Sequence, residues 1–234
     1  MKIQNYLLFC IIMILYSCDD PLVLENDTRI IVKGKVIDSN NLPISNANIL
    51  VYAKKGEGIP TASDIDKKIL GSNFSDSNGD FSVISVLARD DEFTVEVKAN
   101  DDYTLYVYQT NTEDYVPTDL VFNIPTITLN KLATINYDIA RISDEENTLQ
   151  YNFRYLGDFC FEVYDDEDLN IGESRCLLEQ GFGQNLTLNN PTATGDFVAP
   201  INSIVQFNYR LNGGEMQSET FTLNQEDYEF EFSY

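Results

Sequence analysis

The sequence contains no histidine and no tryptophan among its 234 residues. Without histidine, the chain has no imidazole-based catalytic triad, no His-Glu-x-x-His zinc site and no ordinary histidine acid–base catalysis. It also has no Walker A loop, Gly-x-Ser-x-Gly elbow or Ser-x-x-Lys pair. Residues 181–183, Gly-Phe-Gly, lack the third glycine of a dinucleotide loop. The sequence therefore predicts a protein that is not an enzyme and carries no cofactor.

Positive charge is scarce. The chain has 15 Lys plus Arg against 38 Asp plus Glu, a formal net charge of -23. Such a surface repels phosphate backbones and anionic lipid head groups, so nucleic acid is excluded as a partner. The acidic residues are scattered in pairs such as Asp165-Asp166, which is typical of a solvated surface. Two opposed carboxylates would suffice for a glycosidase, so a carboxylate-dependent hydrolase stays an alternative.

A long apolar run is also missing near the N-terminus. Residues 6–14 are apolar and follow Lys2 after a few positions, but a bilayer span needs about 20 residues. The small residue Ser17 comes soon afterwards. A short charged start, a short apolar core and a small residue before the cut are the anatomy of a secretory signal, predicted here over residues 1–17.

Residues 15–18, Leu-Tyr-Ser-Cys, resemble the lipobox of bacterial lipoproteins. The resemblance implies cleavage just before Cys18 and attachment of fatty acyl chains such as palmitate to Cys18. The following Asp19 and Asp20 resemble the surface-export signal of Bacteroidota lipoproteins. The implied location is the outer membrane, with the chain held by its N-terminal lipid at the cell surface or at the periplasmic face. A simple leader, or a membrane helix with an incidental cysteine, is the alternative.

Aromatic residues are plentiful, with 14 Tyr and 14 Phe, and glycine and proline are interspersed along the chain. No long stretch of helical periodicity occurs outside the signal. This pattern predicts an all-β protein. Residues 18–28 are acidic, contain Pro21 and lack a sustained period, so we expect a tether between the lipid and the fold.

Residues 29–130 show strand patterns separated by polar turns. Three segments match the pattern of a known family, and the matching residues are Gly34, Val36, Asp38, Pro43, Ile44, Ala47, Ile49, Ser75, Asp76, Gly79 and Phe81. On these residues the segment resembles the carboxypeptidase regulatory-like domain, a transthyretin-like or prealbumin-like β-sandwich. Asn41 and Asn46 stand where the family often has glycine, and asparagine tolerates positive φ. The resemblance implies a non-catalytic accessory module.

Residues 131–234 begin a second set of strands. The alternation over residues 132–139 is repeated over residues 149–155, and Asn212-Gly213 is a good hairpin turn. About seven strands are expected here, and their number suggests an immunoglobulin-like sandwich.

Two cysteines are left once Cys10 is removed with the signal and Cys18 is acylated. They are Cys160 and Cys176, and an exported chain meets an oxidising environment. We therefore predict a disulfide between them, which would tie a polar excursion back onto the second module. Two buried thiols are the alternative.

Asp76, Asn78 and Asp80 place oxygen ligands at alternate positions, as at the start of a calcium loop. The closing bidentate glutamate is missing, because Leu87 stands seven positions after Asp80. A hairpin turn closed by Gly79 explains the same residues. Calcium is therefore a weak candidate, and no other metal site is predicted.

Tyr103, Tyr106, Tyr108 and Tyr115 form the densest tyrosine cluster and could stack on sugar rings, although core packing of half of them is the alternative. The predicted function is a lipid-anchored, non-catalytic envelope protein whose surface binds a glycan or an outer-membrane protein. The alternative is a structural or assembly accessory of an outer-membrane complex without its own ligand.

Overall fold

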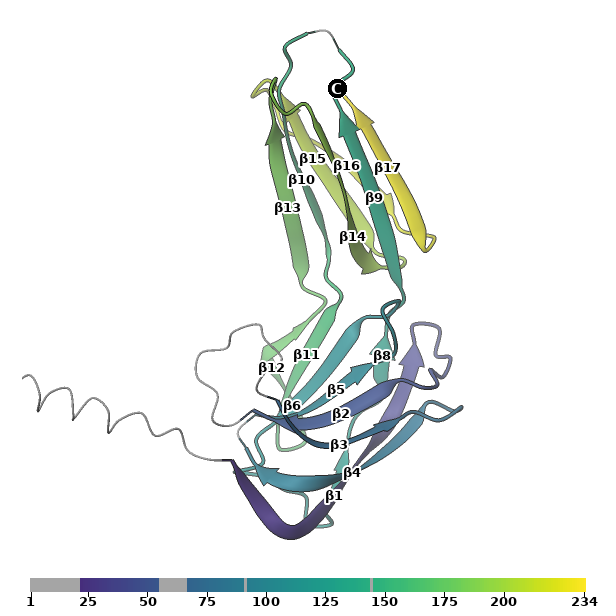
Figure 1. Ribbon diagram of the computed structural model, residues 1–234, viewed down its shortest axis with the longest axis vertical. Coiled ribbons are helices and arrows are strands. Elements are labelled where there is room, and N and C mark those ends of the chain that lie inside the picture. The colour runs from purple at the N-terminus through teal and green to yellow at the C-terminus, as the bar shows by residue number, and fades with distance from the viewer. Residues whose placement is uncertain (1–21, 55–66, 91, 144) are drawn as a thin grey trace, which may run out of the picture.

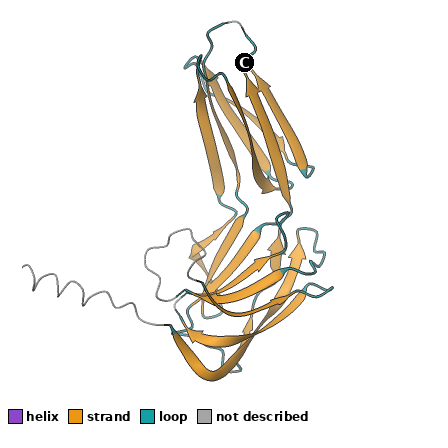
Figure 2. Cartoon of the chain, in the orientation of Figure 1, coloured by secondary structure: helices purple, strands orange, loops and turns teal. Residues whose placement is uncertain are grey.

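The computed structural model describes residues 22–54, 67–90, 92–143 and 145–234. Within these ranges the regular secondary structure consists of strands alone, as Figure 2 shows. The strands are β1 (Val23–Asp38), β2 (Asn48–Ala53), β3 (Lys68–Phe74), β4 (Asp80–Arg89), β5 (Phe93–Lys98), β6 (Leu105–Thr110), β7 (Val121–Asn123), β8 (Ile127–Leu129), β9 (Leu132–Ala140), β10 (Leu149–Leu156), β11 (Phe159–Asp165), β12 (Asp168–Cys176), β13 (Glu179–Leu186), β14 (Thr192–Pro200), β15 (Ile204–Leu211), β16 (Gln217–Thr222) and β17 (Asp227–Ser233). In the described part of the chain, no helix is long and apolar enough to cross a membrane.

The strands form two β-sandwiches stacked end to end (Figure 1). In the first sandwich, a sheet of order β4-β1-β7, with β8 also on β1, faces a six-stranded sheet of order β12-β11-β6-β5-β2-β3. In the second, the sheet β13-β10-β15-β16 faces the sheet β14-β9-β17. The predicted all-β fold with two sandwiches is confirmed.

Both sandwiches use one strand order. Strand β1 lies between antiparallel β4 and parallel β7 and β8, and β9 lies likewise between antiparallel β14 and parallel β17. The facing sheets correspond too, because β3-β2-β5-β6 matches β13-β10-β15-β16. An immunoglobulin sandwich pairs its second strand with its first and fifth. Here β10, the second strand of this sandwich, pairs with β13 and β15, its third and fifth strands, and not with β9, its first. The immunoglobulin-like expectation is therefore wrong.

The hairpin of β11 and β12 departs from the predicted boundary between residues 130 and 131. The chain leaves the second sandwich after β10, and β11 pairs in parallel with β6 of the first sandwich. Strand β12 then pairs with β11 before the chain returns through β13. The free edge of β6 offers N–H and C=O groups that this pairing satisfies. Residues 159–176 therefore complete the first sandwich although they interrupt the second.

In the part of the chain that the structure describes, three segments consequently cross between the two sandwiches, at residues 130–131, 157–158 and 177–178. Backbone hydrogen bonds brace the crossings. Leu105 N donates to Asp158 O at 2.9 Å, and Gly157 N donates to Leu178 O at 2.9 Å. A single linker allows domains to swivel, whereas three crossings, two of them hydrogen-bonded to each other, restrict the relative motion of the two bodies.

The predicted tether, residues 18–28, is not a free linker over its second half. Strand β1 begins at Val23, which pairs with Arg89 of β4, and Glu25 forms an ion pair with Arg89 at 2.9 Å. The register shifts between Leu24 and Arg29, because Asp27 adopts a φ of 58° within an irregularity of the strand. Because this irregularity interrupts the alternation of side chains between the two faces, residues 23–28 lack the period of two that predicts a strand. Residues 18–21 lie outside the described part.

Each sandwich has its own core. The first core is mainly aliphatic, with fully buried residues such as Ile30, Val32 and Ile49. The second is rich in aromatic rings around Phe153 and Phe207, both fully buried. Phe153 has ring centroids within 6 Å on Tyr137, Tyr151, Phe182, Phe197, Phe207 and Phe230. Aromatic burial thus stabilises the second sandwich.

Candidate functional site

The predicted lipidation site, Cys18, lies outside the described residues, as do the rest of residues 15–18 and the acidic pair after them. Lipid attachment therefore stays a prediction. The described chain begins in the first sandwich, and the C-terminus lies at the far end of the second (Figure 1).

The residues that carry the family resemblance converge at one end of the first sandwich. Ser75 Oγ donates to Ile44 O at 2.7 Å and accepts from Ala47 N at 2.9 Å. Gly79 O accepts from Val36 N at 2.8 Å, and Gly79 has a φ of 77°. These buried contacts tie three segments that are distant in sequence. The motif accordingly has a structural role at this junction.

The two asparagines in glycine positions support the same interpretation. Asn41 has a φ of 63° and Asn46 a φ of 59°, both in the left-handed region. Gly34 is needed for close packing, since a β-carbon there would lie 2.7 Å from the ring of Phe81. The motif residues therefore serve backbone turns and packing.

The weak calcium candidate is a tight hairpin turn. Asp76 Oδ1 accepts from Asn78 N at 2.8 Å and from Asp80 N at 3.0 Å, while Gly79 N donates to Asp76 O at 3.0 Å. The carboxylate of Asp80 lies 3.5 Å from Lys35 Nζ. Calcium binding stays a prediction, and the turn accounts for these residues without an ion.

The four tyrosines do not form one exposed row. Tyr106 and Tyr108 are each 5% exposed and belong to the first core. Tyr103 is half-buried and packs against that core, and Tyr115 donates to Glu167 Oε1 at 2.8 Å. A sugar-stacking platform of all four rings is therefore wrong, because alternation along β6 turns Tyr106 and Tyr108 inward.

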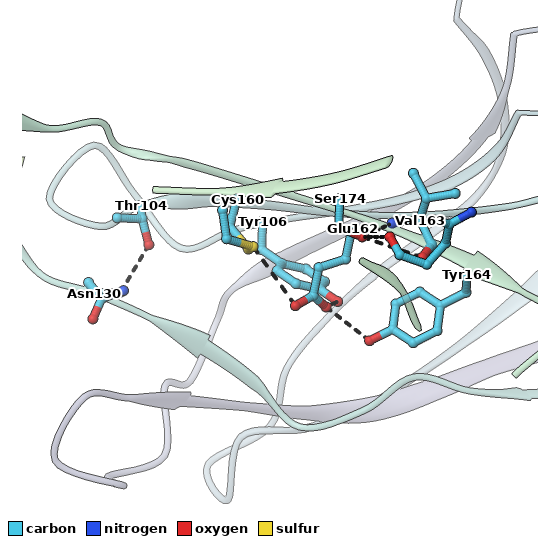
Figure 3. The surroundings of a disulfide bond; sticks show 10 residues. Thr104, Tyr106, Asn130, Cys160, Glu162, Val163, Tyr164 and Ser174 are labelled. Atoms are coloured by element: carbon cyan, nitrogen blue, oxygen red, sulfur yellow. Dashed lines mark hydrogen bonds between the residues drawn. A yellow bond between two sulfur atoms is a disulfide. The ribbon is translucent and has the colours of Figure 1, made fainter. Parts of the chain in front are cut away.

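The structure contains a disulfide between Cys160 and Cys176 (Figure 3). The two residues face each other across β11 and β12, so the bond closes the hairpin that extends the first sheet. The expectation that it ties the second module is therefore wrong. Loss of this bond is expected to loosen the added edge of the first sandwich.

Beside the disulfide, the carboxylate of Glu162 accepts hydrogen bonds from two tyrosine hydroxyls (Figure 3). Tyr106 Oη donates to Glu162 Oε2 at 2.6 Å, and Tyr164 Oη donates to the same oxygen at 2.9 Å. The ring of Tyr164 stacks on Tyr108 at a centroid distance of 4.5 Å. This cluster joins the hairpin to β6 through side chains as well as through the backbone.

Sequence reasoning missed the Glu162 cluster, although part of the signal was visible. Cys160, Glu162 and Tyr164 alternate along β11 and so share one face of the sheet. Alternation alone does not predict which neighbouring strand these three side chains contact. Ligand atoms of Cys160, Glu162 and Cys176 lie within 4.8 Å of one another, but sulfurs joined in a disulfide are not thiolate metal ligands.

Burial, followed by the hydrogen bond to Glu162, raises the pKa of Tyr106 above its ordinary value, and the same two causes raise the pKa of Tyr164 to about 12. Unfolded tyrosine has a pKa near 10.0. The folded state thus favours the neutral phenol, and its contribution to stability is complete below pH 10 and lost as pH rises toward 12.

We therefore expect the free energy of unfolding to fall above about pH 10. Tyr106→Phe should flatten that fall, because the phenol that resists ionisation is gone, and should cost about 1 kcal/mol at neutral pH. Urea unfolding followed by circular dichroism from pH 7 to 11 measures both effects. Tyr228→Phe, at a half-buried tyrosine of the second sandwich, is the control. An unchanged alkaline slope in Tyr106→Phe would contradict this assignment.

No family model matches the chain, and no curated protein matches it. Solved structures with some similarity include a 9R-lipoxygenase from Cyanothece, 14% identical with a TM-score of 0.30 over 55% of this chain and 20% of that one. A streptococcal ancillary pilin is 9% identical with a TM-score of 0.32 over 89% of this chain and 63% of that one.

The tip fimbrial protein Mfa3 of Porphyromonas gingivalis is 10% identical with a TM-score of 0.30 over 86% of this chain and 82% of that one. The chain thus spans less than two thirds of the lipoxygenase and of the ancillary pilin. TM-scores of 0.30 to 0.32 support no inference about function.

Proposed function

We propose that this chain is a lipid-anchored, non-catalytic protein of the cell envelope that holds its second sandwich away from the membrane as a binding or structural surface. The supporting observation is the triple crossing between the sandwiches, in which β11 and β12 complete the sheet of the first body. The N-terminal end of the described chain lies in one sandwich and the C-terminus at the far end of the other, which supports a role as a spacer (Figure 1).

The anchor is tested at Cys18. Cys18→Ala should abolish incorporation of labelled palmitate, because acylation requires that thiol. Cys10→Ala, within the signal itself, is the matched control and should be labelled as the original chain is. Labelled fatty acid on Cys18→Ala would contradict the anchor. Protease added to intact cells then distinguishes the cell surface, where both sandwiches are removed, from the periplasmic face, where they are protected.

The absence of catalysis is tested with glycosidic and ester substrates on the purified protein. We expect no turnover. Turnover that a single Asp→Asn or Glu→Gln change abolishes would replace this proposal with a carboxylate-dependent hydrolase.

A structural accessory of a larger complex is a second candidate. Ile31 of β1 and Ile84 of β4 face each other across the strand pair and are 40% and 70% exposed. Apolar side chains exposed side by side favour contact with another protein. Cross-linking in intact envelopes, compared between the original chain and Ile84→Glu, would test this candidate.

A further inference from the structure

The two outer faces of the second sandwich differ in chemistry. On the sheet β14-β9-β17, five carboxylates alternate with core residues and point away from the core. These are Asp138, Asp196, Asp227, Glu229 and Glu231, all exposed. We call this set the acidic face. It is typical of a chain with a net charge of -23.

The outer face of the opposite sheet carries amides and guanidinium groups. Alternation along β10 and β15 places six such residues opposite the buried side of these strands, and we call them the amide face. They are Gln150, Asn152, Arg154, Gln206, Asn208 and Arg210. Across this strand pair Gln150 faces Arg210, Asn152 faces Asn208, and Arg154 faces Gln206. On the neighbouring strand β13, Glu179 lies at the edge of this face beside Arg154.

Hydrogen bonds within the amide face use one end of each amide. Asn208 Nδ2 donates to Asn152 Oδ1 at 2.9 Å, and Gln206 Nε2 donates to Ser218 Oγ at 2.8 Å. Arg210 Nε donates to Gln150 Oε1. Within the described ranges, Asn152 Nδ2 and Asn208 Oδ1 have no protein partner, so the pair keeps both a free donor and a free acceptor.

The guanidinium groups are spaced along the face. Arg154 and Arg210 lie on neighbouring strands and are offset by four residues, which is about 14 Å at the usual strand rise and spacing. Arg154 meets Glu179 at 3.4 Å, but both side chains are more than half exposed and such a pair is weak. Both guanidinium groups are therefore available to bind a carboxylate.

We propose that the amide face binds an acidic glycan, a chain of sugar rings that carries hydroxyls and spaced carboxylates. Amides donate to and accept from hydroxyls, and guanidinium groups pair with carboxylates. The rest of this acidic surface repels such a ligand, so the amide face is where it binds. The proposal rests on the proposed function and names the ligand of its binding surface.

A second copy of the chain fits the amide face less well. Its acidic face would bring five carboxylates against two guanidinium groups, Arg154 and Arg210, and the excess charge would be desolvated without partners. A glycan with sparse carboxylates avoids that cost.

The test uses the whole purified chain, with isothermal titration against polygalacturonate, neutral dextran and polyglutamate. We expect binding to polygalacturonate that weakens with added salt. The double variant Arg154→Gln/Arg210→Gln should weaken it about tenfold or more, and Asn152→Ala should also weaken it. Asn136→Ala, on β9 between residues of the acidic face, is the matched control and should bind as the original chain does.

Binding to polygalacturonate that survives in the double variant would overturn the proposal, and so would no binding at all. Dextran that binds as tightly as polygalacturonate would contradict a role for the guanidinium groups. Polyglutamate that binds as tightly would show that the face recognises negative charge and not sugar. Self-association lost in the double variant would replace the glycan by a second copy. Palmitate labelling of Cys18 is independent of these results, so failure here is distinguishable from failure of the anchor.

Discussion

Phe153→Ala is expected to lower the free energy of unfolding of the second sandwich by about 3–5 kcal/mol. The ring is fully buried and lies within 5 Å of Phe207 and within 5.3 Å of Phe230, measured between centroids. Removing it leaves a cavity between the two sheets and takes away edge and offset contacts among the surrounding rings.

Hydrogen exchange followed by mass spectrometry measures this effect separately in each sandwich. Peptides from β9, β10 and β13 to β17 should exchange faster in Phe153→Ala, while peptides from β2 and β5 should change little. Phe74→Ala is the control, because that ring is 60% exposed and its loss should have a small effect. A cost below about 1 kcal/mol for Phe153→Ala would mean that the ring is not central to the core.

Gly79→Ala is expected to destabilise the first sandwich by about 3 kcal/mol or more. Two costs combine at this position. Gly79 has a φ of 77°, which an L side chain rarely adopts, and a β-carbon would lie 2.2 Å from Val36 O. The backbone must therefore move, and the hydrogen bond from Val36 N to Gly79 O is lost or weakened.

Gly213→Ala separates the two costs. Gly213 has a φ of 70°, but a β-carbon there would meet nothing within 4 Å. This variant should cost only the backbone term, about 1–2 kcal/mol. Urea unfolding curves of both variants, each read against the original chain, give the comparison. Similar losses in the two variants would contradict the close approach at Gly79.

Period-2 alternation predicted strands over much of the chain because one face of each sheet is buried. The expected count of about seven strands in the second module agrees with its sheets only by coincidence, because that count included residues 159–164, which form β11 of the first sandwich, and named no strand at β13 or β14. The turns at Asn41 and Asn46 were also predictable from the sequence, because both residues adopt the positive φ that asparagine tolerates. These features depend on residues that are near one another in sequence.

Pairing partners depend on contacts between distant residues, and there the sequence was less informative. Residues 159–164 have a clear strand pattern, yet nothing in that pattern names β6 as the neighbour. The amide face could have been seen, because Gln150-x-Asn152-x-Arg154 and Gln206-x-Asn208-x-Arg210 alternate in the sequence. Its meaning appeared only when the pairing of β10 and β15 brought the two rows side by side.

The return of β11 and β12 to the first sandwich also dictates an order of events during synthesis. Residues up to 130 supply most of the first sheet, but its edge beyond β6 stays open until residue 176 has been made. By then β9 and β10 exist without β13 to β17, the strands they pair with. The first body is therefore completed before the second, but only after the second has begun. A chain halted shortly after residue 130 would present the bare edge of β6 to any neighbouring strand, with the aggregation hazard that such edges bring.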